Sequence, residues 1–176
     1  MAFAHDTDVS LQAAVTLVNS GEDPDTLTSR AELDAFYERF EFTGRHDRDD
    51  AELAAVRRLR PRLRALLTAD RDEAVGLVNE LLAEARALPQ LTRHDRFDWH
   101  VHAVSPDAPL DRRIAVETAM AMIDVIRADE MSRLGVCAQD DCQSIVLDLT
   151  RNRSKIFCGG ACSNRAAVAA YRARNR

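Results

Sequence analysis

Apolar residues recur every three or four positions through the first 90 residues, a spacing that predicts amphipathic helices. The expected helices begin near residues 6, 29, 49 and 70. Ser29 and Glu32 form a capping-box pattern, and Pro61 should kink or divide the third helix. The fourth helix should end before Pro89, with its apolar positions facing a core: Val75, Val78, Leu81, Leu82 and Ala85.

The pattern changes to period two over residues 96–104, which predicts a β-strand and one arm of a hairpin. One side of this strand carries Phe97, Trp99, Val101 and Ala103. His100 and His102 share the opposite side, where exposed strand histidines are the simpler interpretation and a metal or ligand role is the alternative. After a turn at residues 105–109, a long helix is expected from Leu110 to about Arg133.

The composition agrees with one sizeable core and a small appendage, because 46% of the 176 residues are hydrophobic. No apolar run reaches the ~20 residues of a membrane span, and no basic segment precedes an apolar stretch at the N-terminus. We therefore expect a soluble, cytoplasmic protein with no membrane partner. The sequence has no glycine-rich phosphate loop, nucleophile elbow or convincing acid pair, so an enzyme is not expected.

Charge divides the chain into two unlike parts. The net charge of −5 is the sum of +5 over residues 133–176 and −10 over the rest. No acidic residue follows Leu149. A basic end on an acidic body suggests a nucleic-acid-binding segment, although a solvated tail is an equally open interpretation.

All four cysteines lie in this basic part, as Cys137-x4-Cys142 and Cys158-x3-Cys162. Zinc binds four thiolates in a tetrahedron, and two close pairs brought together by a hairpin satisfy that geometry. A clustered quartet in a reducing compartment favours structural Zn²⁺, with two disulfides or four free thiols as the alternatives. Four thiolates leave no open position for water, which argues against a catalytic zinc.

The segments around these cysteines suggest a treble-clef-like order of knuckle, hairpin and helix. Residues 144–149 have strand character, Ile156 and Phe157 could return as the second strand, and residues 166–174 are alanine-rich and helical. Val168 and Tyr171 would pack against the hairpin. The expected fold is mainly α: a helical N-terminal domain with a small β-hairpin over residues 1–132, and a zinc module over residues 133–176.

Several short motifs resemble the CGNR zinc-finger family. They are Arg151-Asn-Arg-Ser154, Phe157-Cys158, Cys162-Ser-Asn-Arg165 and the helix from Ala167 to Arg174, with Ser163 replacing the glycine of the family signature. The upstream helical region is similar to the companion domain known as ABATE, so the resemblance covers nearly the whole chain. It implies a stress-induced transcription regulator with a C-terminal DNA-binding finger.

The basic residues of the module are the candidate nucleic-acid contacts. On a helix, Arg165, Arg172 and Arg176 fall near one line and Arg174 points away. The full candidate set is Arg151, Asn152, Arg153, Lys155, Asn164, Arg165, Arg172, Arg174 and Arg176. Other interpretations need no nucleic acid. Arg165 could offset thiolate charge, Asn164 could brace the helix start, Asn152 could favour the turn, and the last arginines could be a solvated tail.

The sequence therefore predicts a DNA-binding transcriptional regulator. A zinc-stabilised protein-interaction module without DNA binding is the alternative, and RNA is supported less because only one aromatic residue, Tyr171, follows the last cysteine. A homodimer would help one finger read a longer site, and a small-molecule effector of the helical domain is not identified by the sequence.

Overall fold

The computed structural model describes residues 3–93 and 99–175. Seven α-helices, one 3-10 helix and four short strands follow one another in this part of the chain. In order they are α1 (His5–Asn19), α2 (Arg30–Arg39), α3 (Asp50–Arg58), α4 (Arg60–Thr68), α5 (Arg71–Glu84), β1 (Gln90–Thr92), β2 (His100–His102), α6 (Leu110–Arg127), η1 (Met131–Arg133), β3 (Leu134–Val136), β4 (Ile145–Leu147) and α7 (Gly160–Arg174). The mainly helical fold class is confirmed.

Local capping signals set the starts of three helices. The Ser29 side chain accepts a hydrogen bond from the Glu32 backbone N–H, and the Glu32 carboxylate accepts one from the Ser29 N–H, which completes the predicted capping box. The carboxylates of Asp49 and Asp70 cap α3 and α5 in the same way. Pro61 lies in the first turn of α4, where it costs no hydrogen bond, so the predicted long helix is divided there.

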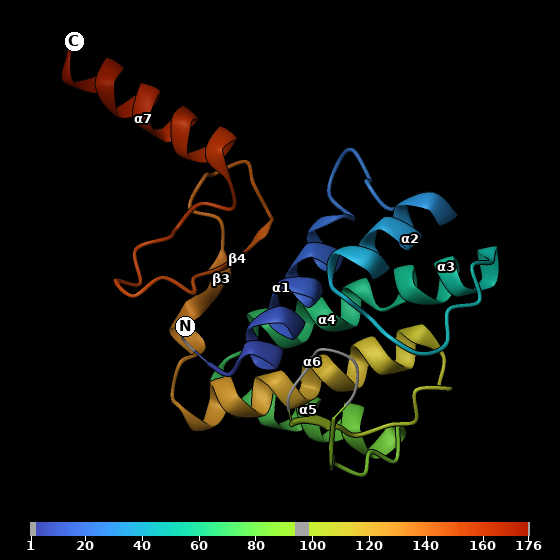
Figure 1. Ribbon diagram of the computed structural model, residues 1–176. Coiled ribbons are helices and arrows are strands. Elements are labelled where there is room, and N and C mark those ends of the chain that lie inside the picture. Colours follow the sequence, from blue (N-terminus) through green and yellow to red (C-terminus); the bar gives the residue numbers. More distant parts are fainter. Residues whose placement is uncertain (1–2, 94–98, 176) are drawn as a thin grey trace.

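The core lies between α1, α4, α5 and α6, whose apolar faces meet side by side (Figure 1). Its largest fully buried side chains include Leu11, Leu17, Leu33, Leu63, Leu66, Leu67, Leu110, Ile114 and Met122. One predicted core position is wrong, because Val75 is 42% exposed on α5 while Val78 and Leu81 are buried. Within the described ranges, no helix combines the length and apolar character that a bilayer crossing requires.

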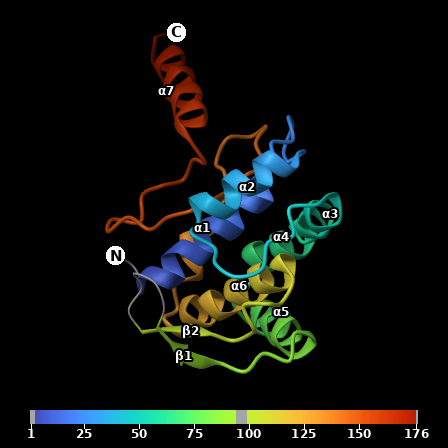
Figure 2. The same cartoon turned by 45° about the vertical axis from the view of Figure 1, so that its right-hand side comes forward.

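The predicted hairpin is formed by β1 and β2, which pair antiparallel (Figure 2). The interpretation as exposed strand histidines is wrong: His100 and His102 are half-buried, whereas Trp99 is 64% exposed and Val101 36% exposed. His102 lies 3.9 Å from Glu117 of α6, and Ala103, just after the strand, is also buried. Phe97 lies outside the described residues.

The helix α6 ends at Arg127, six residues before the predicted end. Asp129 adopts a left-handed conformation (φ 57°), and the Glu130 N–H donates to the Val125 carbonyl, which closes the helix with a turn. The 3-10 helix η1 then leads into β3. The predicted continuous helix to Arg133 is therefore wrong.

Strands β3 and β4 form a second antiparallel pair that packs on the helical body. Ile145 and Leu147 belong to the main hydrophobic core. The Asn19 side chain at the end of α1 donates to the Ile145 carbonyl (2.8 Å) and accepts from the Ile145 N–H (2.7 Å). Both figures show α7 projecting away from this body (Figures 1 and 2).

Candidate metal centre

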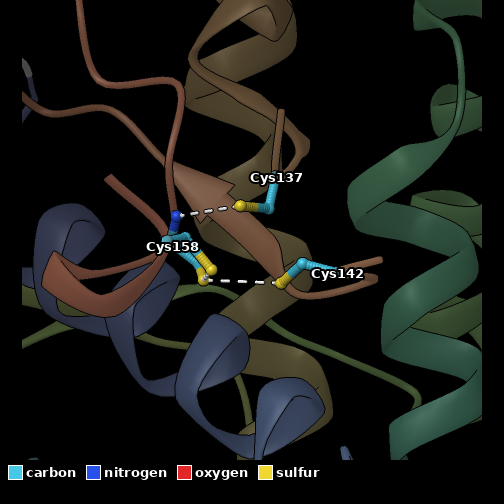
Figure 3. A group of neighbouring side chains, drawn as sticks. Cys137, Cys142 and Cys158 are labelled. Atoms are coloured by element: carbon cyan, nitrogen blue, oxygen red, sulfur yellow. Dashed lines mark hydrogen bonds between the residues drawn. The ribbon is translucent and has the colours of Figure 1, made fainter. Parts of the chain in front are cut away.

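The four cysteine sulfurs gather at the base of α7. The Sγ atoms of Cys137, Cys142, Cys158 and Cys162 all lie within 4.8 Å of one another. Cys158 Sγ is 3.6 Å from the Sγ atoms of both Cys142 and Cys162, and Figure 3 shows the first of these contacts. These separations are far longer than a disulfide bond of about 2.05 Å, so the four thiols are not paired covalently.

The arrangement fits a tetrahedral zinc ion. With zinc–sulfur bonds of ~2.3 Å, the edges of an S₄ tetrahedron measure about 3.8 Å. The 3.6 Å contacts match that edge length, and the 4.8 Å limit leaves only a small contraction for the remaining edges. Among the described residues, no other cluster of histidine, cysteine or acidic side chains has this spacing.

Short backbone interactions place each sulfur. Cys137 directly follows β3, and its N–H donates to the Ser144 carbonyl (2.9 Å), which closes the knuckle that carries Cys142. The Cys158 N–H points at Cys137 Sγ (3.4 Å), as drawn in Figure 3. Cys162 lies in the first turn of α7, so the metal cluster also fixes where that helix begins.

The electrostatics of the cluster are compatible with a bound cation. Hydrogen bonds from Ser144 lower the pKa of the Cys142 thiol to about 7, whereas burial raises that of Cys158 to about 12. The Cys142 thiol ionises readily and the Cys158 thiol does not, because hydrogen bonds favour one thiolate and burial opposes the other, which conflicts with a site of four thiolates. A divalent ion bound by all four would remove this conflict, since metal binding displaces the thiol protons.

One detail of the module differs from the prediction. The second strand was expected at Ile156 and Phe157, but β4 pairs instead with β3, before the first cysteine. The reason is Asp148, a buried residue whose carboxylate accepts from the backbone N–H groups of Thr150 (2.8 Å) and Lys155 (2.7 Å). These bonds close residues 150–155 into a turn, so the chain returns to the cysteines without a strand ladder.

The helix α7 begins at Gly160, earlier than the predicted start near residue 166. Ser163, which stands in place of the family glycine, lies inside this helix and needs no left-handed backbone. Val168 and Tyr171 do not pack against the hairpin as expected, since they are 48% and 63% exposed. Within α7 only Cys162 is buried, so the helix is anchored at its first turn alone.

Three of the predicted basic contacts have partners inside the protein. Arg165 donates to Cys162 Sγ (3.3 Å) and to the Asp141 carboxylate (3.1 Å). Arg153 pairs with Glu130 (2.6 Å), and Lys155 Nζ donates to the Leu147 carbonyl (3.1 Å). The other described candidates are exposed: Arg151, Asn152, Asn164, Arg172 and Arg174. Arg176 lies outside the described residues.

Sequence reasoning missed the supporting polar groups of the module, namely Ser144, Asp141 and Asp148. Ser144 is two residues after a cysteine, a spacing that could have marked it as a hydrogen-bond donor to sulfur. Asp141 and Asp148 were counted only as charges that reduce the basic character of this region. Their contacts with Arg165 and with residues 150–155 depend on the folded arrangement.

Comparisons with known protein families give two matches. Residues 11–129 match the ABATE family, described as "Putative stress-induced transcription regulator". Residues 133–175 match the CGNR zinc finger. A comparison with curated proteins found no match. Both matched families are of the regulator and zinc-finger type, and the four clustered cysteines fit the structural zinc that such a finger binds.

Proposed function

The chain belongs to the ABATE family and carries a CGNR zinc finger, and we propose that it regulates transcription by binding DNA through that finger. In this proposal Cys137, Cys142, Cys158 and Cys162 hold a structural Zn²⁺ ion. Residues 133–176 act as the DNA-binding domain, and residues 1–132 act as the regulatory domain. The observation that carries the proposal is α7, a basic helix that projects from the helical body and has nearly all of its own surface exposed.

The dimensions of α7 suit the major groove of DNA. An α-helix with its side chains is about 10–12 Å across, and the major groove is about 12 Å wide. Because α7 has 15 residues and only its first turn is held by the cysteine cluster, most of its length could enter a groove without a clash with the helical body. The seven basic residues after Leu149, with no acid among them, would supply attraction to phosphate.

The internal contacts divide the candidate residues by role. Arg172 and Arg174 on α7, and Arg151 in the turn, are exposed and are proposed to contact phosphates. Asn152 and Asn164 are exposed amides that could reach base edges. Arg165 is proposed mainly to neutralise the metal site, because four thiolates and one Zn²⁺ leave a local charge of about −2.

A protein-interaction role is the second candidate, and one observation favours it. Val168 and Tyr171 lie about one turn apart on α7 and are both largely exposed, so the helix offers an apolar strip as well as basic groups. Such a helix could lie in a groove of an acidic partner protein. In that case zinc would only order the helix, and no duplex binding would be measured.

Salt-dependent DNA binding tests the proposal. Zinc-loaded protein should bind duplex DNA at low salt, with affinity that falls steeply as salt rises. The variant Arg172→Ala/Arg174→Ala should bind more weakly on every sequence and reduce the log–log salt slope by about 2, one unit for each phosphate contact. Arg58→Ala, an exposed arginine of α3, is the matched control and should change neither quantity.

Two results would contradict DNA binding. The first is a double variant with the affinity and salt slope of the unaltered protein, which would remove α7 from the interface. The second is the absence of any duplex binding by zinc-loaded protein at low salt. Recovery of a single protein partner after nuclease treatment, with loss of that partner in Tyr171→Ala, would then support the interaction module.

A further inference from the structure

A cavity of about 460 Å³ opens between α1, the segment after α2, β2 and α6. This volume lies within the range of pockets that bind small molecules. The cavity is in the helical body, at the end of α1 opposite to Asn19, and is separate from the cysteine cluster. Figure 2 shows the hairpin that bounds it lying along α6.

The walls of this cavity are largely apolar. Val9 of α1, Phe42 of the segment after α2, and Met120 and Ile123 of α6 line it. Trp99 is also among the lining residues and is 64% exposed, which places an aromatic face beside the opening. Such walls favour a ligand with an apolar body, since burial of apolar surface is the main source of its affinity.

The carboxylate of Glu117 lies among these apolar walls with one long ionic contact, to His102. Within the part of the chain that the structure describes, Glu117 accepts no hydrogen bond, and its Oε1 is 3.9 Å from Nδ1 of His102. Its side chain is only 26% exposed. Burial raises the pKa of Glu117 to about 7 in spite of the nearby Arg113 charge. This half-buried acid has only that long contact, and a cationic ligand would give its carboxylate a closer partner.

The remaining polar groups give the cavity an acidic balance. Nε2 of His100 and Nε2 of His102 are 3.0 Å apart, within hydrogen-bond distance of each other. Asp124 accepts from the Thr7 hydroxyl at 2.6 Å. The charged side chains among the described lining residues are four carboxylates and one guanidinium: Asp6, Glu41, Glu117, Asp124 and Arg127.

We propose that this cavity binds an amphipathic organic cation, with its apolar body against Met120 and Ile123 and its ammonium group directed toward Glu117 and Asp124. An organic anion fits less well, because the lining residues that the structure describes carry four carboxylates and one guanidinium. A neutral apolar molecule would give the Glu117 carboxylate no closer partner than His102. A metal ion alone would leave the apolar walls unused, and among the described residues only the four cysteines have the spacing of a metal cluster.

Three probes with one carbon skeleton test the charge preference: 4-phenylbutylamine, 4-phenyl-1-butanol and 4-phenylbutyrate. Titration of the full zinc-loaded chain can be followed by calorimetry and by the fluorescence of Trp99, the only tryptophan in the sequence. The protonated amine should bind at least tenfold more tightly than the alcohol, and the carboxylate should bind most weakly. Equal binding of the three probes, or tighter binding of the carboxylate, would overturn the proposal.

The variant Glu117→Gln separates the charge of this residue from its shape. It should lower the affinity for the amine about tenfold and leave the affinity for the alcohol unchanged. Glu80→Gln, at an exposed acid of α5, should change neither affinity. A thermal melt checks that the Glu117→Gln protein is folded. The larger Met120→Trp should block all three probes by filling the cavity. Unchanged amine affinity in folded Glu117→Gln would refute the role assigned to this carboxylate.

Discussion

Removal of zinc should unfold α7 while leaving the helical body folded. Within α7 only Cys162 is buried, and its other residues contact the rest of the chain little. An isolated helix of 15 residues is marginal in water even when it is rich in alanine. The metal cluster is therefore the anchor that holds the first turn of α7, and the turns beyond it depend on that start.

The magnitude follows from the helix lengths. The α-helices of the described chain span 90 residues together, and α7 supplies 15 of them. Chelation should therefore remove about one-sixth of the far-UV helical signal, and one equivalent of zinc should restore it. Strands β3 and β4 should stay in place, because Ile145 and Leu147 are buried in the main core without help from the metal.

Circular dichroism during chelation, together with hydrogen exchange of the α7 amides, measures this effect. Cys158→Ser should resemble the chelated protein, and a chain that ends at residue 159 should show no further change with chelator. Full protection of α7 in zinc-free protein would refute the reasoning. So would loss of the entire helical signal in one step, because it would mean that the metal holds the whole fold.

Three further predictions concern the helical body. Asn19→Ala should cost about 2–3 kcal/mol in urea unfolding, since it leaves a buried N–H and a buried carbonyl of β4 unpaired. The hydrogen bond from Arg60 lowers the pKa of Asp25 to about 2, so this pair stabilises the fold above pH 4, and about 1–2 kcal/mol should be lost as pH falls from 4 to 2. In the Asp25→Asn variant, the free energy of unfolding should depend less on pH between pH 4 and pH 2. Gly44→Ala should cost at least about 2 kcal/mol by thermal unfolding, because Gly44 has φ +86° and a Cβ there would lie 2.4 Å from a backbone carbonyl oxygen.

Features set by residues within a few positions of each other could be predicted from the sequence. The capping box of Ser29 and Glu32 and the division at Pro61 depend on groups at most four positions away, and both occur as expected. The cysteine quartet could be identified because one metal ion needs four ligands, whatever the path of the chain between them. The structure brings the same four sulfurs together.

Features set by distant contacts could not be predicted in this way. The strand partner of residues 145–147 is β3, because the buried Asp148 closes the following turn and Asn19 holds β4 on α1. The alternation around residue 100 indicated a strand and favoured exposed histidines, but His100 and His102 are half-buried while Trp99 is 64% exposed, and all three line a cavity. Periodicity gives two faces, and only the packing of α6 decides which one is inside.

Helix α1 contacts both the cavity and the zinc module. Its first turns line the cavity, and its last residue, Asn19, binds the backbone of β4, which leads out of the cysteine knuckle. Fifteen residues at 1.5 Å each span about 22 Å, and a helix packed along that length moves as a unit. A ligand that shifted the first turns of α1 would therefore shift the support of the zinc finger as well. If the proposed cation alters the proposed DNA binding through this helix, the change should be lost in Asn19→Ala protein that still binds the cation.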